Sequence, residues 1–260
     1  MRSRLSVRWL SATLPKSSNR MEENEDAFYI QQGQNGVFQG DSFQCSISDG
    51  ATRSSFSRYF AQSLVAASCI GQGNRNIQQI LHTARNEWSA YIETLNLDWA
   101  AKQKTAEGAY ATLLWVRFFP QGSGNILWKN TWHANVVGDT CLFQFRKDQP
   151  VKLLPVQKAA DFNNHPPLLS SHQKNILWRE DWEHTGSWEA GDDFFLATDA
   201  MAKWMMQYLE ARKNPIPLIK DRLSRKSEPT YFQQWIASLR RQKEIRDDDT
   251  TIIWLKLMEP

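Results

Sequence analysis

The sequence has little cysteine and no long apolar segment. Three of its 260 residues are cysteine, at Cys45, Cys69 and Cys141, and none has the spacing of a metal-binding pair. A sparse, odd number of cysteines argues against a disulfide scaffold and indicates a reducing compartment. No run approaches the roughly 20 apolar residues that a membrane helix needs, and the basic N-terminal segment lacks the apolar core of a signal peptide. We therefore expect a cytoplasmic protein that binds no membrane.

Motifs of several enzyme classes are also missing. The chain contains no GxxxxGK[ST] phosphate loop, no GxGxxG dinucleotide fingerprint and no GxSxG nucleophile motif. Its five histidines show no HxxxH or Cys-His spacing, which argues against zinc. The 31 basic and 28 acidic residues give a net charge of +3, too balanced to indicate nucleic-acid binding. Basic residues are denser over 220–246, but acidic residues interleave with them, as on a solvated helical face.

The composition is that of a folded globular chain, with 41% hydrophobic, 12% aromatic and 23% charged residues. Its length fits one large domain or two small ones, and either can bury a core. Apolar residues alternate, or recur at helical spacing, in most segments. Strands are expected at 5–13, 27–32, 41–50, 109–119, 124–138, 140–147, 192–199 and 250–257, and helices at 53–70, 74–96, 200–211 and 229–241.

The order of these elements predicts the fold class. The central strands follow one another through short turns, which favours antiparallel pairing. The helices come in pairs rather than one per strand, which argues against a doubly wound parallel sheet. Residues 150–190 show no periodicity and are predicted to be irregular. We therefore expect an α+β sandwich with mainly antiparallel sheets inside and helix pairs outside.

Acidic residues recur at the predicted strand ends. Each has an ordinary structural interpretation: an Asp-Gly or Gly-Asp turn, a helix N-cap or a solvated acidic loop. Carboxylates that converge, however, repel one another and cost stability unless a cation neutralises them. All-oxygen ligation selects hard cations such as Mg²⁺ or Mn²⁺. The positions concerned are Glu25, Asp26, Asp49, Asp139, Asp199 and residues 247–249.

Six segments, in this order, resemble motifs of the metal-dependent protein phosphatases, the protein phosphatase 2C (PPM) family. The resemblance runs from about residue 5 to residue 257, and the segment after Gly50 is similar to that of a divergent, bacterial-type branch. It implies a single domain over 1–260 with an α-β-β-α four-layer sandwich, two mainly antiparallel sheets flanked by helix pairs. The segments are NEDAF (24–28), ISDG (47–50), EGAYATLLWVR (107–117), VVGDTCLFQFR (136–146), FFLATDA (194–200) and RDDDTTIIWL (246–255).

The resemblance also implies a site with two Mg²⁺ or Mn²⁺ ions. Asp49 would bridge both ions, and Asp199 and Asp247 would complete the ligands of one. Glu25 and the carbonyl of Gly50 would help to hold the other ion. Family members act by metal-assisted hydrolysis of phosphomonoesters, in which Asp49, Asp199 and Asp247 would act through a metal-bound water.

Three further acids have implied or open roles. Asp26 would support the metal ligands. Asp139 resembles an acid that helps some members to hold a third, weaker ion. Counting back from Thr250 makes Asp247 the ligand, and a slip of one residue would exchange it for Asp248. The implied substrate is phosphoserine or phosphothreonine in a protein, acted on by a monomer.

The sequence departs from the family pattern where the substrate phosphate would bind. The family often has an arginine four residues before its first glutamate, and this position is Met21 here. Arg20, Lys16 and Arg53 are the candidate replacements. The leading hypothesis is therefore an active serine/threonine phosphatase, and the alternative is a catalytically weak pseudophosphatase that serves as a regulatory protein-binding module. A third possibility is an unrelated metal- or polyanion-binding protein that uses the basic segment 220–246.

Overall fold

The computed structural model describes residues 4–33, 36–52, 54, 56–70, 76–122, 129–163, 165–172, 179–225 and 230–258. Arg53, one of the predicted phosphate-binding residues, lies outside the described residues.

Two antiparallel sheets form the centre of the molecule. One has six strands in the order β3 (Val37–Gly40), β1 (Leu5–Leu14), β13 (Thr250–Met258), β12 (Asp193–Ala197), β8 (Cys141–Arg146), β9 (Gln149–Leu154). The other has five strands in the order β11 (Glu183–Ser187), β7 (Thr131–Val137), β6 (Leu113–Phe119), β4 (Phe43–Asp49), β2 (Asp26–Ile30). A small ribbon pairs β5 (Tyr110–Ala111) with β10 (Leu169–Ser170).

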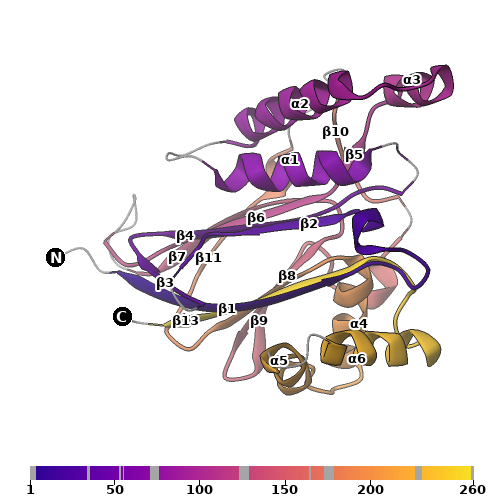
Figure 1. Ribbon diagram of the computed structural model, residues 1–260. Coiled ribbons are helices and arrows are strands. Elements are labelled where there is room, and N and C mark those ends of the chain that lie inside the picture. Colours follow the sequence, from indigo (N-terminus) through magenta and orange to yellow (C-terminus); the bar gives the residue numbers. More distant parts are fainter. Residues whose placement is uncertain are drawn as a thin grey trace.

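Helices cover the outer side of each sheet (Figure 1). On the side of the five-stranded sheet lie α1 (Ser57–Cys69), α2 (Ile77–Thr94) and α3 (Trp99–Ala106). On the side of the six-stranded sheet lie α4 (Asp199–Glu210), α5 (Ile216–Ser224) and α6 (Thr230–Arg241). The predicted α-β-β-α sandwich is confirmed, with three helices rather than two on each side. None of the described helices is both long and apolar enough to cross a membrane.

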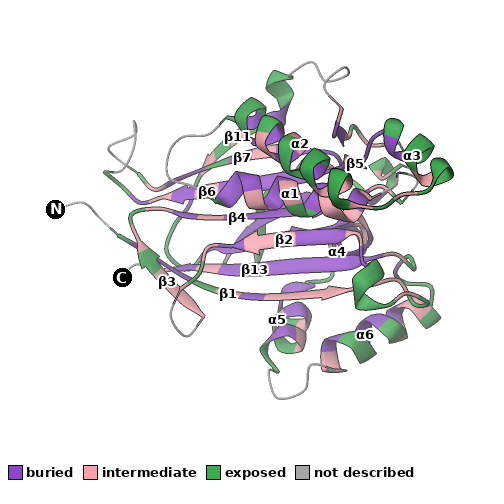
Figure 2. Cartoon of the chain, turned by 45° about the horizontal axis from the view of Figure 1, so that its top comes forward, coloured by how far each residue is buried: buried purple, intermediate pink, exposed green. Residues whose placement is uncertain are grey.

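Three apolar cores hold the four layers together. Ile47 and Phe194 lie in the core between the two sheets. Leu64 and Ile80 belong to the core that joins α1 and α2 to the five-stranded sheet, and Trp204 to the core beneath α4, α5 and α6. Figure 2 shows β4, β6 and β13 buried along most of their length and the outward faces of the helices exposed. Strands buried on both faces are rigid supports for whatever lies at their ends.

The structure differs from the sequence prediction in several elements. The region 150–190, predicted to be irregular, contains most of β9 together with β10 and β11. β9 and β11 lie at sheet edges and expose polar residues, so they lack the apolar alternation that identifies a strand. The short strand β3 and the helices α3 and α5 were also not predicted. Pro215 and Pro217 lie at the start of α5, and two prolines so close together are more typical of a loop, so the helix was not recognised.

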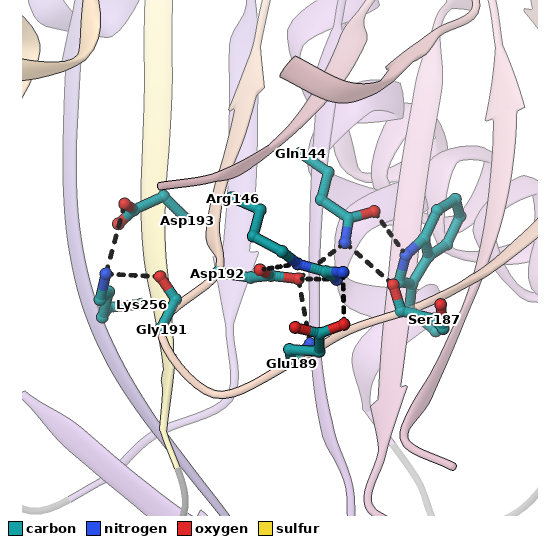
Figure 3. Close-up of polar contacts among 9 residues, drawn as sticks. Gln144, Arg146, Ser187, Glu189, Gly191, Asp192, Asp193 and Lys256 are labelled. Atoms are coloured by element: carbon teal, nitrogen blue, oxygen red, sulfur yellow. Dashed lines mark hydrogen bonds and ion pairs between the residues drawn. The ribbon is translucent and has the colours of Figure 1, made fainter. Parts of the chain in front are cut away.

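A buried polar network joins the two sheets at one end of β12 (Figure 3). The carboxylate of Asp192, which is fully buried, accepts hydrogen bonds from Arg146 Nε at 2.8 Å and from Gln144 Nε2 at 2.9 Å. Gln144 lies in the six-stranded sheet, and its amide also contacts the other sheet by donating to Ser187 O at 2.9 Å. Burial alone would raise the pKa of Asp192, but these hydrogen bonds and the charge of Arg146 lower it.

We expect Asp192→Ala to lower the free energy of unfolding by about 3 kcal/mol, because it leaves Arg146 and Gln144 without their buried partner. Because the pKa of Asp192 is lowered below 3.8 in the fold, its contribution is present above pH 3.8 and is lost as the pH falls further. Urea denaturation at pH 7 and at pH 3 measures both effects.

The matched control is Asp181→Ala, because Asp181 pairs with Arg179 and both side chains are 60% exposed. We expect almost no change in its urea midpoint. Equal midpoints for the two variants would contradict the structural role of Asp192.

Candidate functional site

Acidic residues from separate strand ends meet at one end of the sandwich. Asp26 begins β2 and Asp49 ends β4, and the two are direct partners in the antiparallel register. Asp199 follows β12, and Asp248 precedes β13. These strand ends lie opposite the end at which β1 begins and β13 ends (Figure 1). A pocket of about 590 Å³ opens there, with walls that include Asp49, Gly50, Asp139, Asp199, Arg246 and Asp248.

Asp49 is held at its backbone by Thr112. The N–H of Thr112 donates to Asp49 O at 2.9 Å, and the N–H of Asp49 donates to Thr112 Oγ1 at 2.8 Å. Thr112 Oγ1 also lies 2.7 Å from Thr140 Oγ1, next to Asp139 in the chain. These bonds fix Asp49 without using its carboxylate, which is left to line the pocket. Sequence reasoning assigned Thr112 no role, because these contacts appear only after the strands have paired.

Two glycines allow the chain to close around the site. A Cβ atom at Gly50 would lie 2.9 Å from the carbonyl oxygen of Glu25, so no other residue fits there without a shift. Gly138 has φ +101°, and a Cβ atom there would lie 2.4 Å from Thr112 Cγ2. Glycine alone adopts such a conformation at little cost. The tight turn predicted at Gly138 therefore brings Asp139 against the Thr112 segment.

Five carboxylates form an acidic cluster, which we define as Asp26, Asp49, Asp139, Asp199 and Asp248. Burial raises the pKa of Asp49 well above its usual value, and the charges of the other four raise it further. Burial also raises the pKa of Asp26, and burial followed by the charge of Asp248 raises that of Asp199. For Asp139, burial and then the charge of Asp199 raise the pKa to about 7. These four acids thus destabilise the fold when ionised.

Asp26 is supported by Thr198, the residue that precedes α4. Thr198 Oγ1 donates to Asp26 Oδ2 at 2.9 Å and accepts from the N–H of Thr251 at 3.0 Å. Thr198 is the N-cap of α4, yet its side chain makes no capping hydrogen bond. The other carboxylate oxygen of Asp26, Oδ1, is buried and has no hydrogen-bond partner among the described residues. A buried, unpartnered anionic oxygen is costly and calls for a cation or water.

Asp199 lies in the first turn of α4, where its Oδ1 accepts from the N–H of Ala200 at 2.6 Å. It still lines the pocket.

The structure separates Asp247 from the acidic cluster, contrary to its expected role as a ligand. Its Oδ1 accepts from the N–H of Ser17 at 2.9 Å and from Ser17 Oγ at 2.8 Å, and it lies 3.4 Å from Arg240 Nε. These hydrogen bonds and positive charges lower its pKa despite partial burial, the opposite of the shifts in the cluster. Asp248 lines the pocket instead, which is the register that a slip of one residue would give.

Asp249 explains this register. Its Oδ1 accepts from the N–H of Lys16 at 2.8 Å, and its Oδ2 accepts from the N–H of Glu25 at 2.7 Å. Because Asp249 is buried and bound to the N-terminal part of the chain, the two residues before it face different ways. Asp247 faces Ser17, and Asp248 faces the pocket. The sequence predicted no role of its own for Asp249, because three consecutive aspartates have the same chemistry and only long-range contacts distinguish them.

Glu25 lies beside Gly50, whose N–H donates to the Glu25 carbonyl at 3.2 Å. Its carboxylate accepts a hydrogen bond from Ser57 Oγ and pairs with Lys16 Nζ at 3.6 Å. Lys16 is thus bound to an expected ligand, and neither it nor Arg20 is among the residues that line the pocket. The basic residue that does line it, Arg246, was not predicted.

The donor atoms of this region are those that hard cations prefer. Among the residues that the structure describes, no three His, Cys, Asp or Glu side chains stand close enough together to hold an ion. The cluster nevertheless supplies carboxylate oxygens, including the unpartnered Oδ1 of Asp26, and its raised pKa values signal uncompensated negative charge. Oxygen donors of this kind fit Mg²⁺ or Mn²⁺.

We expect Asp139→Asn to change how the stability of the chelator-treated protein depends on pH. The pKa of Asp139 is about 7 in the fold against 3.8 without it, so the folded state keeps a proton that the unfolded chain releases. The resulting stability is fully present below pH 3.8 and is lost as the pH rises through about 7. From pH 5 to pH 8, the unsubstituted protein should lose about 3 kcal/mol relative to Asp139→Asn. Urea denaturation tests this, and parallel pH profiles would contradict it.

Comparisons with known proteins agree with this geometry. A family model described as protein phosphatase 2C matches residues 17–253. A comparison with curated proteins finds no match.

Several solved structures have the same fold at low sequence identity. The photosystem II phosphatase PBCP is 16% identical with a TM-score of 0.56, over 96% of this chain and 98% of that chain. The catalytic domain of the serine threonine protein phosphatase PstP, in complex with two manganese ions, is 14% identical with a TM-score of 0.56, over 98% and 100%. The S. agalactiae serine/threonine phosphatase is 14% identical with a TM-score of 0.55, over 96% and 99%. Identities this low show the fold alone, but the family model spans most of the sequence, and the chain therefore belongs to the protein phosphatase 2C family.

Proposed function

We propose that this protein is a Mg²⁺- or Mn²⁺-dependent serine/threonine phosphatase that hydrolyses phosphomonoesters in phosphoproteins. The observation that carries the proposal is the acidic cluster, whose carboxylates come from separate segments, face one region and raise the pKa of Asp49. Such charge costs stability unless cations offset it. Family membership supports phosphate esters as the substrate class.

In this proposal Asp49 would help to hold both of two ions. Asp199 and Asp248 would hold one of them, and Glu25 and the carbonyl of Gly50 would hold the other. The complex of the PstP catalytic domain with two manganese ions supports this number. Asp248 here takes the role that the sequence suggested for its neighbour, because it is Asp248 that lines the pocket.

Two other acids would assist. Asp139 would help to hold a third, weaker ion, and its pKa of about 7 fits a carboxylate that binds a cation reversibly near neutral pH. Asp26 would support the ligands from behind, fixed by the hydroxyl of Thr198.

The bound ions would lower the pKa of a water molecule and offset negative charge on the phosphoryl oxygens. The protein contributes position. Thr112 fixes the backbone of Asp49, so that its carboxylate is pre-oriented before any substrate arrives. No nucleophilic side chain is required, which agrees with the missing GxSxG motif.

A second candidate function is a pseudophosphatase that binds a protein partner. The observation that favours it is Met21, which is 48% exposed and stands where relatives carry a phosphate-binding arginine. Arg20 and Lys16 remain candidate phosphate-binding residues, although both would have to move to reach the pocket.

We expect Asp248→Asn to lower kcat/KM by about 100-fold or more, because it removes a ligand that acts at the reacting centre. The control is Asp247→Asn, which removes the same charge one residue away, outside the pocket, and should stay within about threefold of the unsubstituted protein. The assay follows an aryl phosphate and a phosphothreonine peptide with Mn²⁺, with Mg²⁺ and with chelator.

The outcomes separate the two candidate functions. If the unsubstituted protein binds Mn²⁺ but turns over neither substrate, the enzyme proposal fails. Partner binding that survives both chelation and Asp49→Asn would then support the pseudophosphatase. If Asp247→Asn is the damaging variant, the register described here is wrong.

A further inference from the structure

Arg246 bridges two members of the acidic cluster. Its Nη1 lies 3.2 Å from Asp199 Oδ2, and its Nη2 lies 3.2 Å from Asp248 Oδ2. The two carboxylates come from different elements, the start of α4 and the segment before β13. The guanidinium therefore lies between the negative charges of Asp199 and Asp248.

The surroundings of Arg246 give its charge a defined effect. Burial and the charge of Asp248 raise the pKa of Asp199, whereas Arg246 opposes them. Burial and Asp199 raise the pKa of Asp139, and Arg246 again acts in the opposite direction. Among the described residues that line this pocket, Arg246 is the one lysine or arginine. It is thus the counter-ion that pairs directly with this part of the cluster, and Lys203 adds a second positive charge that lowers the pKa of Asp199.

The guanidinium can leave this position at little cost. Its side chain is 57% exposed, whereas those of Asp199 and Asp248 are 17% and 24% exposed. An arginine at the surface loses little packing when it turns toward water, while Asp199 stays in place on α4 and Asp248 stays next to the buried Asp249. The ion pair is therefore a reversible contact between a mobile cation and a fixed pair of anions.

A divalent ion held by Asp199 and Asp248 would need the same two oxygen atoms. Oxygen ligands lie about 2.0–2.6 Å from Mg²⁺ or Ca²⁺, so an ion bound there would come within a few ångströms of the guanidinium. Like charges at that distance repel. Both cations cannot be paired with the same oxygens at once.

We propose that Arg246 competes with the divalent cation for Asp199 and Asp248. It holds the two carboxylates together when the concentration of free ion is low, and an ion must displace it to bind. This inference rests on the proposed metal-dependent function. The ion pairs of Arg246 would then set the concentration of divalent ion that is needed to occupy the site at Asp199 and Asp248.

The test is a calorimetric titration of Mn²⁺ into chelator-treated protein, with Arg246→Gln as the main variant. An exposed ion pair contributes little free energy, so its loss should change the affinity only modestly. We expect Mn²⁺ to bind about fivefold tighter to one site in the variant. In the absence of metal, the same variant should unfold at a lower temperature, because the repulsion between Asp199 and Asp248 is no longer offset.

Two further variants sharpen the result. Arg246→Lys keeps the charge but lacks the planar fork that spans two carboxylates, so its Mn²⁺ affinity should lie between the other two. Arg241→Gln is the matched control, because Arg241 is exposed on α6 and does not line the pocket that contains the acidic cluster. It removes the same charge and should leave Mn²⁺ affinity unchanged.

An Arg246→Gln affinity within twofold of the unsubstituted protein, or a weaker one, would overturn the proposal. Equal tightening by Arg241→Gln would overturn it too, because net charge would then explain the effect. Failure of the proposed function looks different: the protein would turn over no phosphoester, while the change in Mn²⁺ affinity could still be present.

Discussion

Repulsion between carboxylates at the ends of buried strands governs this structure. Asp26 and Asp49 are partners across β2 and β4, and burial is the largest cause that raises the pKa of each. The charge of Asp26 raises the pKa of Asp49 further, and the charges of Asp249 and Asp199 raise that of Asp26. A fold that places such groups together must be held by other contacts. The three apolar cores supply that stability, and the backbone bonds of Thr112 and the hydroxyl of Thr198 hold the acids in place.

The two ends of β12 show how differently the protein treats its acids. At one end, Asp192 accepts hydrogen bonds from Arg146 and Gln144, and its pKa is lowered. At the other end, Asp199 has a raised pKa and an exposed, loosely held arginine as its counter-ion. The first arrangement stabilises the fold, whereas the second leaves negative charge for something that binds from outside.

Much of this could be predicted from the sequence, because it depends on local patterns. The buried strands can be recognised by their apolar pattern. Asp49, Asp139 and Asp199 can be selected as candidates because they lie at the ends of these strands. The choice between Asp247 and Asp248 could not be made in this way, since it depends on the bonds of Asp249 to a distant segment. Edge strands such as β11 were missed because solvent, not a core, covers one of their faces.

The bond between Asp249 and Lys16 joins residues that are 233 positions apart, and β13 lies between β1 and β12 in its sheet. During translation, Lys16 therefore leaves the ribosome long before β13 does. Until β13 inserts, Asp248 has no fixed position and the first sheet is divided in two. A chain without β13 would therefore lack the pairing that joins β1 to β12, and with it the arrangement of the acidic cluster.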